Sequence, residues 1–432
     1  MSDLLPKDAS TDLREYLLGL TLHGIKLGLQ NIRFLMEQAG NPQAAYPTAH
    51  VAGTNGKGSV VAMLQAMLRA SGCRVGRFTS PHIIDLPERF QIDGVCIAED
   101  ALSENTAFFR RCAAGMEPPP TFFELNSAIA FRWFAQERVD AAVIEVGMGG
   151  RLDSTNIITP LACAITNIDL EHTQYLGGTL EEIAFEKAGT LKPGVPAATG
   201  ERREGPLNII RARARELAAP LRVLGEDFSY MLSGPVWRQS FSYRSESLAL
   251  KEVPLGLAGR YQGENAAIAV AVAEQLRPHF PGLTDAAIAR GLSEARWPCR
   301  LERILETPPV IIDVAHNVAG ARRLAENIGR CVVVLAVASD KDAAGMIEAL
   351  APLSGSLILT EFNGKRALPL ETLCSAAQGR PHAALPDLPA AIARGIELAS
   401  QEMPLLITGS IYTAGEARQI LTDRYGALPL AF

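Results

Sequence analysis

The sequence predicts an α/β protein in which a large N-terminal domain with a doubly wound parallel sheet precedes a smaller, Rossmann-like α/β domain. Two observations carry this prediction. Short apolar segments alternate with amphipathic helical patterns over most of the chain, and this alternation stops once and then restarts. The length of 432 residues is sufficient for two or three domains. We place the boundary between residues 1–296 and residues 297–432.

Short apolar segments in the first part of the chain are typical of buried parallel strands. They are AHVAG (49–53), RVGRFTS (74–80), AAVIEVG (141–147), ACAITNI (162–168) and VPAATG (195–200). Between several of them run helical patterns, of which 59–72 is an example, with Gly72 as its stop signal. The apolar residues that share one face of this helix are Val60, Met63, Leu64, Met67 and Leu68.

The segment 225–255 interrupts the alternation. It is polar and aromatic and alternates in polarity, which predicts antiparallel strands at an edge or in a small separate sheet. Helical patterns resume at 263–296, and after WPCR (297–300) the strand and helix pattern restarts. Pro298 therefore lies in a linker that is a candidate hinge, and ligand sites are common at such junctions. The apolar segments of the second domain are PVIIDVAHN (309–317), CVVVLAVAS (331–339), GSLILTEF (355–362) and PLLITGS (404–410).

Composition and charge argue against several classes of protein. The net charge is −6 and no run of Lys and Arg occurs, so we expect no nucleic-acid partner. The seven cysteines are scattered and never form C-x-x-C, which is typical of reduced thiols in a cytoplasmic protein and not of a disulfide framework or a zinc site. Because no signal-like apolar region and no unbroken apolar stretch of about 18 residues occurs, we expect no membrane partner.

The segment VAGTNGKGSVV (51–61) is typical of a phosphate-binding loop, since it follows a predicted strand and opens a predicted helix. Its spacing differs from the common G-x-x-x-x-G-K-[ST] form because Gly58 separates Lys57 from Ser59. Lys57 can reach the β- and γ-phosphates, and the Ser59 hydroxyl suits Mg²⁺. The alternative is a glycine-rich turn whose lysine faces solvent. We predict a P-loop ATPase-like domain with the ATP-binding residues Gly53, Thr54, Asn55, Gly56, Lys57, Gly58 and Ser59.

Two polar residues follow neighbouring predicted strands. Glu145 ends the strand at 141–147, and His172 follows the next one, in NIDLEHT (167–173). A carboxylate and an imidazole at adjacent strand ends can hold Mg²⁺ near the phosphates. The alternative for His172 is an ordinary loop histidine. We expect two Mg²⁺ ions, the first on Ser59 and the nucleotide, the second on Glu145 and His172.

The loop GTNGKGS (53–59) resembles that of the Mur ligase superfamily, and its GKGS form is similar to the folate branch, the folylpolyglutamate synthases. The resemblance continues in family order from about residue 15 to 425. Cys299 and Val314 depart from the usual residues without changing a polar group. The matching blocks are TSPHI (79–83), ERFQIDG (88–94), TFFELNSAIAF (121–131), IEVGMGGRLDSTNI (144–157), ITNIDLEHTQYLG (165–177), EKAGTLKPG (186–194), GRYQGENAAIA (259–269), WPCRLE (297–302), IDVAHN (312–317), SDKD (339–342) and TGSIY (408–412).

This resemblance implies an ADP-forming acid–amino-acid ligase. Such an enzyme adds L-glutamate to the carboxylate of a reduced folate through an acyl phosphate made from ATP. The resemblance leaves open whether dihydropteroate is a second acceptor of glutamate. The alternative within the superfamily is a ligase for another acid, such as a cell-wall peptide precursor, against which GKGS and TSPHI argue. A P-loop kinase would not need DVAHN and TGSIY. A binding module without turnover would not need Lys57, Glu145 and His172.

The resemblance also implies roles for single residues in catalysis and ATP binding. Lys187 would be carbamylated and join the metal site, whereas a lysine on a helix is otherwise a solvated surface charge. Asn265 would bind adenine and Arg300 would neutralise charge on the γ-phosphate. Asp313 would face the ribose or orient Arg300, unless it only caps the end of its strand. The catalytic residues implied are Lys57, Lys187, Asp313 and His316.

The remaining implications concern the acceptor, the glutamate and the state of the protein. His316 and Ser410 would bind glutamate. Lys26 stands where enzymes with both activities often carry Asp, and a cation there would weaken recognition of the pterin's donor-rich edge. The family is further taken to imply a cytoplasmic monomer, with K⁺ as an additional cofactor. The residues implied for the folate are Ser80, His82 and Phe123, each of which is otherwise an ordinary loop or core residue.

Overall fold

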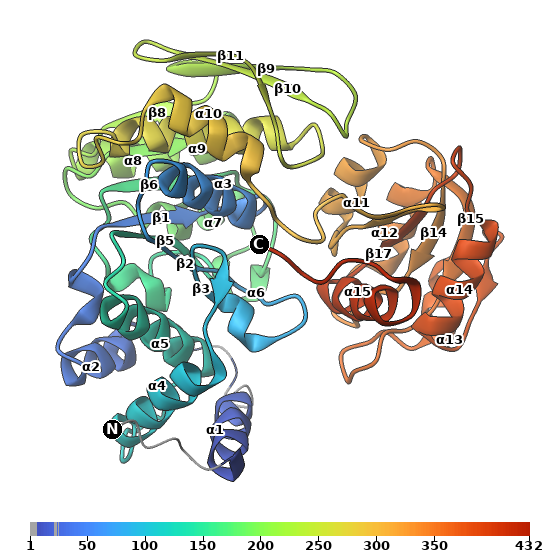
Figure 1. The fold of residues 1–432 in the computed structure, drawn as a ribbon, viewed down its shortest axis with the longest axis horizontal. Helices are drawn as coiled ribbons and strands as arrows, with labels where there is room; N and C mark the ends of the chain where they lie inside the picture. Colours follow the sequence, from blue (N-terminus) through green and yellow to red (C-terminus); the bar gives the residue numbers. More distant parts are fainter. Residues whose placement is uncertain (1–6, 21–23, 25) are drawn as a thin grey trace.

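The computed structural model describes residues 7–20, 24 and 26–432, which form two α/β parts joined at residues 295–301. In Figure 1 the part before this connection lies on the left and the part after it on the right. The predicted boundary at 296 and 297 falls within the connection, and the choice of residue stays a prediction. Across the described ranges, no helix has the length and apolar character needed to cross a membrane.

The N-terminal part is built on a sheet with the strand order β4-β3-β2-β5-β1-β6-β7-β8. The strands β2, β5, β1, β6, β7 and β8 are parallel to one another, which confirms the predicted doubly wound α/β fold. At one edge β3 and β4 are antiparallel, and the sequence analysis predicted no strands there. The chain returns from β2 without a crossover helix, and such a short connection allows only antiparallel pairing. The strands are β1 (Thr48–Ala52), β2 (Val75–Phe78), β3 (Phe90–Ile92), β4 (Val95–Cys96), β5 (Ala141–Glu145), β6 (Ala162–Ile165), β7 (Ala197–Thr199) and β8 (Leu221–Val223).

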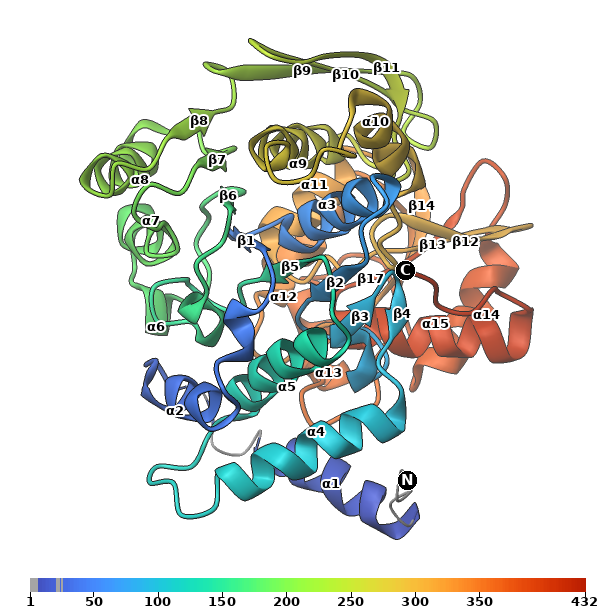
Figure 2. The ribbon, with the colours of Figure 1, turned by 60° about the vertical axis from the view of Figure 1, so that its left-hand side comes forward.

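Helices cover both faces of this sheet, as Figures 1 and 2 show from two directions. One face carries α3 (Lys57–Ala70), α9 (Gln262–Leu276) and α10 (Asp285–Glu294). The other face carries α5 (Phe122–Gln136), with α2 (Gln30–Gln38) and α4 (Glu99–Cys112) packed around it. The remaining helices of this part are α1 (Lys7–Gly19), α6 (Thr173–Leu176), α7 (Leu180–Ala188) and α8 (Glu204–Glu216).

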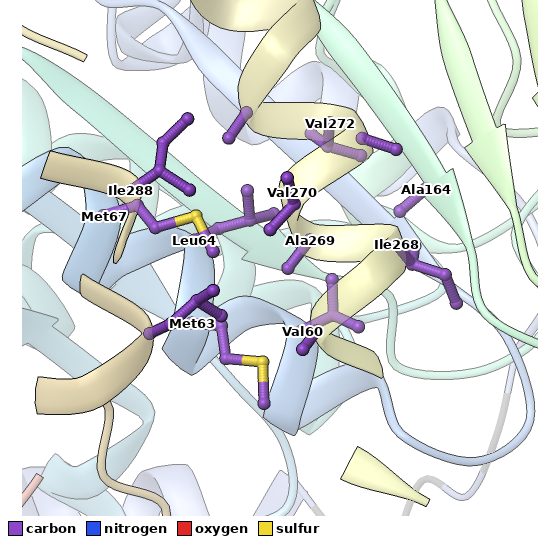
Figure 3. Packing of buried hydrophobic residues seen from close by; sticks show 14 of the residues in the cluster. Val60, Met63, Leu64, Met67, Ala164, Ile268, Ala269, Val270, Val272 and Ile288 are labelled. Atoms are coloured by element: carbon purple, nitrogen blue, oxygen red, sulfur yellow. The ribbon is translucent and has the colours of Figure 1, made fainter. Parts of the chain in front are cut away.

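The apolar face predicted for residues 59–72 is buried in α3. Figure 3 shows Val60, Met63, Leu64 and Met67 pointing toward apolar side chains of α9 and α10. Full burial of each such side chain contributes roughly 1.5–3 kcal/mol. A Cβ at Gly291 of α10 would lie 2.4 Å from the Met67 Cα, so α10 approaches α3 closely at this glycine. Val60, in the first turn of α3 directly after the phosphate-binding loop, belongs to the same packed cluster.

The segment 225–255 forms the predicted antiparallel strands as a small sheet with the order β11-β10-β9. Its inward side packs on α9 through Tyr230, Leu232 and Phe241, and the sheet lies at the top of Figure 1. On the same side the Glu274 carboxylate of α9 accepts hydrogen bonds from Ser245 and Ser247. The strands are β9 (Phe228–Ser233), β10 (Ser240–Ser245) and β11 (Ala249–Pro254).

The C-terminal part is built on a second sheet with the order β12-β13-β17-β14-β15-β16, parallel except for β12. Helices α11, α12 and α13 cover one face and α14 and α15 the other. This is the predicted Rossmann-like arrangement. The strands are β12 (Glu302–Glu306), β13 (Pro309–Ile312), β14 (Cys331–Leu335), β15 (Ser354–Leu359), β16 (Ala383–Ala384) and β17 (Leu405–Thr408), and the helices are α11 (Val318–Ala325), α12 (Ala343–Leu350), α13 (Leu370–Ala376), α14 (Leu388–Leu398) and α15 (Ile411–Tyr425).

Candidate active site

The predicted phosphate-binding loop connects β1 to α3, at the carboxyl edge of the first sheet. Gly56 has φ +87°, a left-handed conformation that favours glycine, and α3 begins at the next residue, Lys57. A Cβ at Gly56 would lie 2.2 Å from the Asn265 Oδ1. The loop therefore lies directly against the start of α9 at Asn265, and the adenine contact implied for this residue stays a prediction.

A second loop, residues 166–169 after β6, holds the phosphate-binding loop in place. Thr54 donates its backbone N–H to the Asn167 carbonyl at 2.8 Å, and the Asn55 N–H donates to the Asn167 Oδ1 at 3.0 Å. The Thr166 hydroxyl donates to the Asn55 carbonyl at 2.7 Å. The sequence analysis missed these supports, although polar residues directly after a buried strand were the available signal. These hydrogen bonds between the two loops hold the backbone of the phosphate-binding loop.

Two lysines share one carbonyl oxygen of this loop. Lys57 Nζ and Lys187 Nζ each lie 2.9 Å from the Gly53 oxygen, and Lys187 Nζ also lies 2.6 Å from the Glu171 carboxylate. The Lys187 side chain is 1% exposed, so the ordinary expectation of a solvated lysine is wrong here. Burial lowers the pKa of Lys187 to about 8, against the opposing attraction of Glu171. Burial alone would raise the pKa of Glu171, but Lys187 and Lys57 hold it below its usual value.

The predicted metal ligands lie around the same edge, but the strands that precede or carry them, β5 and β6, are separated by β1 and are not neighbours as predicted. Glu145 is the last residue of β5, is buried, and accepts a hydrogen bond from the Ser80 N–H at 3.1 Å. Burial raises the pKa of Glu145, while Lys57 opposes that shift. Ser59 is buried in the first turn of α3, and His172 directly precedes α6. Hydroxyl and carboxylate oxygens are the donors that Mg²⁺ prefers, so Ser59 and Glu145 fit the implied ion, whereas His172 would offer a ring nitrogen.

Within the described ranges, no cluster of three or more His, Cys, Asp and Glu side chains stands ready to hold a metal. This is compatible with Mg²⁺ in a nucleotide site, because Mg²⁺ keeps several waters and often takes only one or two protein carboxylates plus phosphate oxygens.

A cleft between the two parts of the molecule brings together residues that are far apart in the chain. Its N-terminal side is formed by the phosphate-binding loop and the start of α9. Its C-terminal side is formed by the segment after β13 and by α11. The predicted ATP-binding residues Asn265, Arg300 and Asp313 therefore meet the loop in one place. The lining residues are Asn55, Gly56, Ser59, Tyr261, Asn265, Arg300, Asp313, Ala315, His316, Asn317, Gly320, Arg323 and Leu324, of which Tyr261, Asn317 and Arg323 were missed by the sequence analysis.

Asp313 uses its carboxylate to hold the backbone around it. Its two oxygens accept the N–H groups of Leu301 and Ala315, each at 2.8 Å. Burial raises the pKa of Asp313, and the nearby Arg300 opposes that shift. In this structure the carboxylate thus acts as the strand-end cap that was the alternative to a ribose contact.

The two residues implied for glutamate binding do not lie in the same cavity. His316 lines the nucleotide cleft, and its Nδ1 donates to the Val314 carbonyl at 3.0 Å. Burial lowers the pKa of His316 to about 4, so the ring is neutral near pH 7 and its Nε2 is an acceptor. Ser410 is absent from that lining; its hydroxyl accepts the Tyr412 N–H at 3.2 Å and caps α15. The pairing of His316 with Ser410 as lining residues of one glutamate site is therefore not supported by the geometry.

A second pocket of about 340 Å³ lies beside Glu145, whose carboxylate accepts a hydrogen bond from the lining residue Ser80, and it is more apolar than the cleft. Ser80 and Phe123 line it as predicted, whereas His82 does not. The His82 ring accepts a hydrogen bond from Arg89 Nε at 3.0 Å and so stands behind a lining residue. The lining residues are Gly24, Lys26, Leu27, Ser80, Pro81, Arg89, Thr121, Phe122, Phe123, Gly147, Met148, Leu152, Asp153, Ser154 and His172.

The fold and the two cavities define a class of proteins, and the comparisons agree on it. Residues 51–193 match the Mur ligase middle domain, and residues 299–411 match the glutamate ligase domain of Mur ligases. The chain is 36% identical over 433 residues to the dihydrofolate synthase/folylpolyglutamate synthase of Bacillus subtilis, with 96% of this chain and 99% of that protein covered. It is 32% identical over 417 residues to the protein of the same name from Escherichia coli, with 95% and 94% covered.

Solved structures give the same result. The structure of Mycobacterium tuberculosis folylpolyglutamate synthase complexed with ADP has a TM-score of 0.89 and 32% identity, covering 98% of this chain and 99% of that one. The E. coli FolC structure in complex with DHPP and ADP has a TM-score of 0.87 and 30% identity, covering 96% and 98%. The chain belongs to the folylpolyglutamate synthase/dihydrofolate synthase family of Mur ligases.

Proposed function

We propose that this protein adds L-glutamate to the carboxylate of a reduced folate, with conversion of ATP to ADP and phosphate, and that it also accepts dihydropteroate. One observation carries the proposal: the second pocket lies next to the phosphate-binding loop and its charged neighbours, through two pairs of neighbouring groups. Ser80 lines the second pocket and donates to Glu145. His172 lines the same pocket, while the adjacent Glu171 holds Lys187 at the phosphate-binding loop.

This arrangement supports an acyl-phosphate mechanism. A carboxylate presented from the second pocket lies beside the loop that receives the ATP phosphates. Attack of its oxygen on the γ-phosphorus breaks the bond to the bridging oxygen, forms the acyl phosphate and releases ADP. Lys57 neutralises charge that develops on the transferred group, and phosphoryl transfer depends mainly on such positioning and neutralisation. The glutamate amine then displaces phosphate from the acyl carbon. The C-terminal part covers the cleft and limits the access of water to the acyl phosphate.

Mg²⁺ is part of the proposal. Ser59 and the nucleotide would hold one ion, and Glu145 and His172 a second. The ions would supply charge neutralisation and alignment of the phosphate oxygens. K⁺ as a further cofactor, a monomeric state and a cytoplasmic location stay predictions. Carbamylation of Lys187, the addition of CO₂ to its neutral amine with loss of a proton, is supported by the crowding of two amines at one carbonyl oxygen.

The lining of the second pocket supports both a reduced folate and dihydropteroate as substrates. Lys26 lies in it, and a cation disfavours the donor-rich edge of a pterin. Asp153 lies in it as well, and its carboxylate would supply a hydrogen-bond acceptor for the donor-rich edge of the pterin. The sequence analysis named no such acceptor. A reduced folate and dihydropteroate share the pterin, and they differ in where the reactive carboxylate stands. A cell-wall peptide precursor has no such group, and the similarity to named folate enzymes favours the folate substrates.

The experiment is ATP-dependent ligation of radiolabelled glutamate, with tetrahydrofolate and dihydropteroate offered separately. Release of ADP that requires both glutamate and a folate supports the ligase and excludes a kinase or a binding module. Turnover on dihydropteroate within about tenfold of that on tetrahydrofolate supports both activities, and none above background restricts the protein to chain extension. In the same assay Lys26→Asp is expected to improve dihydropteroate use a few-fold, roughly the value of one weak charge contact.

A further inference from the structure

A pair of oppositely charged side chains closes one side of the nucleotide cleft. Asp169 lies in the loop after β6, and Arg323 lies on α11 of the C-terminal part. Arg323 Nη2 is 3.9 Å from Asp169 Oδ2. Among the residues that the structure describes, this is the one ion pair that connects the chain before residue 297 with the chain after it.

Asp169 is fixed to the phosphate-binding loop. Its N–H donates to the Thr54 hydroxyl at 2.9 Å, and the Asn55 Nδ2 donates to the same Oδ2 that faces Arg323, at 3.3 Å. Arg203 donates to the other carboxylate oxygen at 3.3 Å. The carboxylate therefore has little freedom, and it presents a charge of fixed position to the opposite wall of the cleft.

Arg323 faces the space that a nucleotide would fill. It lines the cleft together with Asn55 and Ser59, and its side chain is 37% exposed. At 3.9 Å and partly exposed, its pairing with Asp169 is a weak surface ion pair. A nucleotide polyphosphate carries several charges and accepts two parallel N–H groups from one guanidinium, which makes it a stronger partner than a single carboxylate.

We propose that Arg323 is a nucleotide-binding residue contributed by the C-terminal part, and that Asp169 is a positioning residue that holds it at the cleft. This inference rests on the proposed ATP site and adds two residues to it. Because Arg323 sits on α11 and lines the cleft together with Asn55 and Ser59, it would contact a bound nucleoside di- or triphosphate from the wall opposite the phosphate-binding loop.

The test is a comparison of substitutions in the ligation assay, together with direct titration of ATP and ADP. Arg323→Ala is expected to raise the KM for ATP and the Kd for both nucleotides by about tenfold or more, the usual loss for one charged phosphate contact. The KM for glutamate and the kcat at saturating ATP are expected to stay within about twofold. Arg323→Gln keeps the length of the side chain and answers the same question if the alanine variant is unstable.

Arg322 provides a matched control, because it is the neighbouring arginine on α11 and is exposed. Arg322→Ala is expected to leave both nucleotide affinities unchanged. Asp169→Asn is expected to raise the KM for ATP by about threefold, less than the loss of Arg323, because the guanidinium remains but loses its anchor. Combined with Arg323→Ala it is expected to add almost nothing, since both act through one contact.

Two results would overturn the inference. Arg323→Ala and Arg323→Gln proteins that bind ATP as the unchanged protein does, while Lys57→Ala lowers kcat at saturating ATP, would remove Arg323 from the site and leave the proposed function standing. Equal rises in the KM values for ATP and glutamate would assign Arg323 a purely structural role between the two parts. Failure of the unchanged protein to bind ATP would instead contradict the proposed function.

Discussion

The edges of the two sheets that face each other across the nucleotide cleft use polar side chains in different ways. At the first edge, buried charges are held against one another, as in the contact of Lys187 with Glu171 at 2.6 Å. At the second edge, polar side chains mainly fix the backbone: Asp313 accepts the N–H groups of Leu301 and Ala315, and Ser410 caps α15. The first edge therefore places charged groups close to the phosphate-binding loop, whereas the polar groups of the second edge mainly fix the conformation of the backbone.

The largest expected effect tests the charged edge. Lys57→Ala is expected to lower kcat by about 10²–10³, or roughly 3–4 kcal/mol, because one contact to the developing charge is lost. The fold is expected to persist, since Lys57 only bonds to carbonyls of its own loop. Steady-state kinetics at saturating ATP provide the measurement, with the exposed Lys251→Ala as control. Retention of more than about half of kcat would contradict the phosphate-binding role.

The second prediction tests how the connection between the two parts meets the loop. Gly58 lies in helix α3, where an alanine is compatible with the backbone, yet a Cβ there would lie 2.6 Å from a ring carbon of Trp297. Gly58→Ala is therefore expected to weaken ATP binding by about 100-fold through the forced shift of Trp297 or the loop.

The same substitution in a Trp297→Ala background should cost much less, with a coupling of more than about 1 kcal/mol in the double-mutant cycle. Titration with ATP of the four proteins in the cycle measures it. Additive effects would show that the glycine is needed for a reason other than the indole.

The third prediction concerns the metal. Glu145→Gln and His172→Ala are each expected to raise the Mg²⁺ concentration for half-maximal activity by up to about 100-fold, because a ligand or its charge is lost. Mg²⁺ titrations at fixed ATP give the values. His382→Ala is a suitable control, since this exposed histidine lies outside both pockets. Unchanged Mg²⁺ dependence in both variants would remove the second ion from the site.

The smallest expected effect is a change in the pH dependence of stability, and it distinguishes the buried His50 from His316 of the cleft. His50 is buried in β1, and burial lowers its pKa to about 3, whereas His316 lines the nucleotide cleft. The unfolded chain binds a proton at His50 below about pH 6.5 and the folded chain does not, so stability falls as the pH falls from 6.5 toward 3. The expected loss at pH 5 relative to pH 8 is about 2 kcal/mol from this residue.

Urea unfolding at the two pH values measures this loss. His50→Gln is expected to lessen the pH dependence by that amount, while the exposed His279→Asn should keep it. An equal pH dependence in the His50 variant and the unchanged protein would show that His50 is not the group concerned. His316→Gln is expected to change ATP affinity more than stability.

Much of the site could be predicted because the relevant signals are local. Glu145 and His172 follow buried strands, and the carboxyl ends of parallel strands meet at one edge, so their proximity to the loop follows from the pattern. The contacts made by loops to other loops could not be predicted in this way. Glu171 and Arg323 are charged residues that pair with partners distant in sequence, and nothing in their local sequence marks them. His82, which the resemblance implied for the folate, contacts Arg89, a lining residue of the second pocket.

The sequence by itself determined the alternation of strands and helices and the position of the phosphate-binding loop, because periodicity and glycine spacing act over a few residues. It also showed that a glycine stands between Lys57 and Ser59. Only the tertiary structure explains why residue 58 is a glycine. Trp297 comes from the connection between the two parts and packs where a Cβ of residue 58 would be. The identity of a residue can be fixed by a neighbour that folding alone brings near, and no local pattern carries that information.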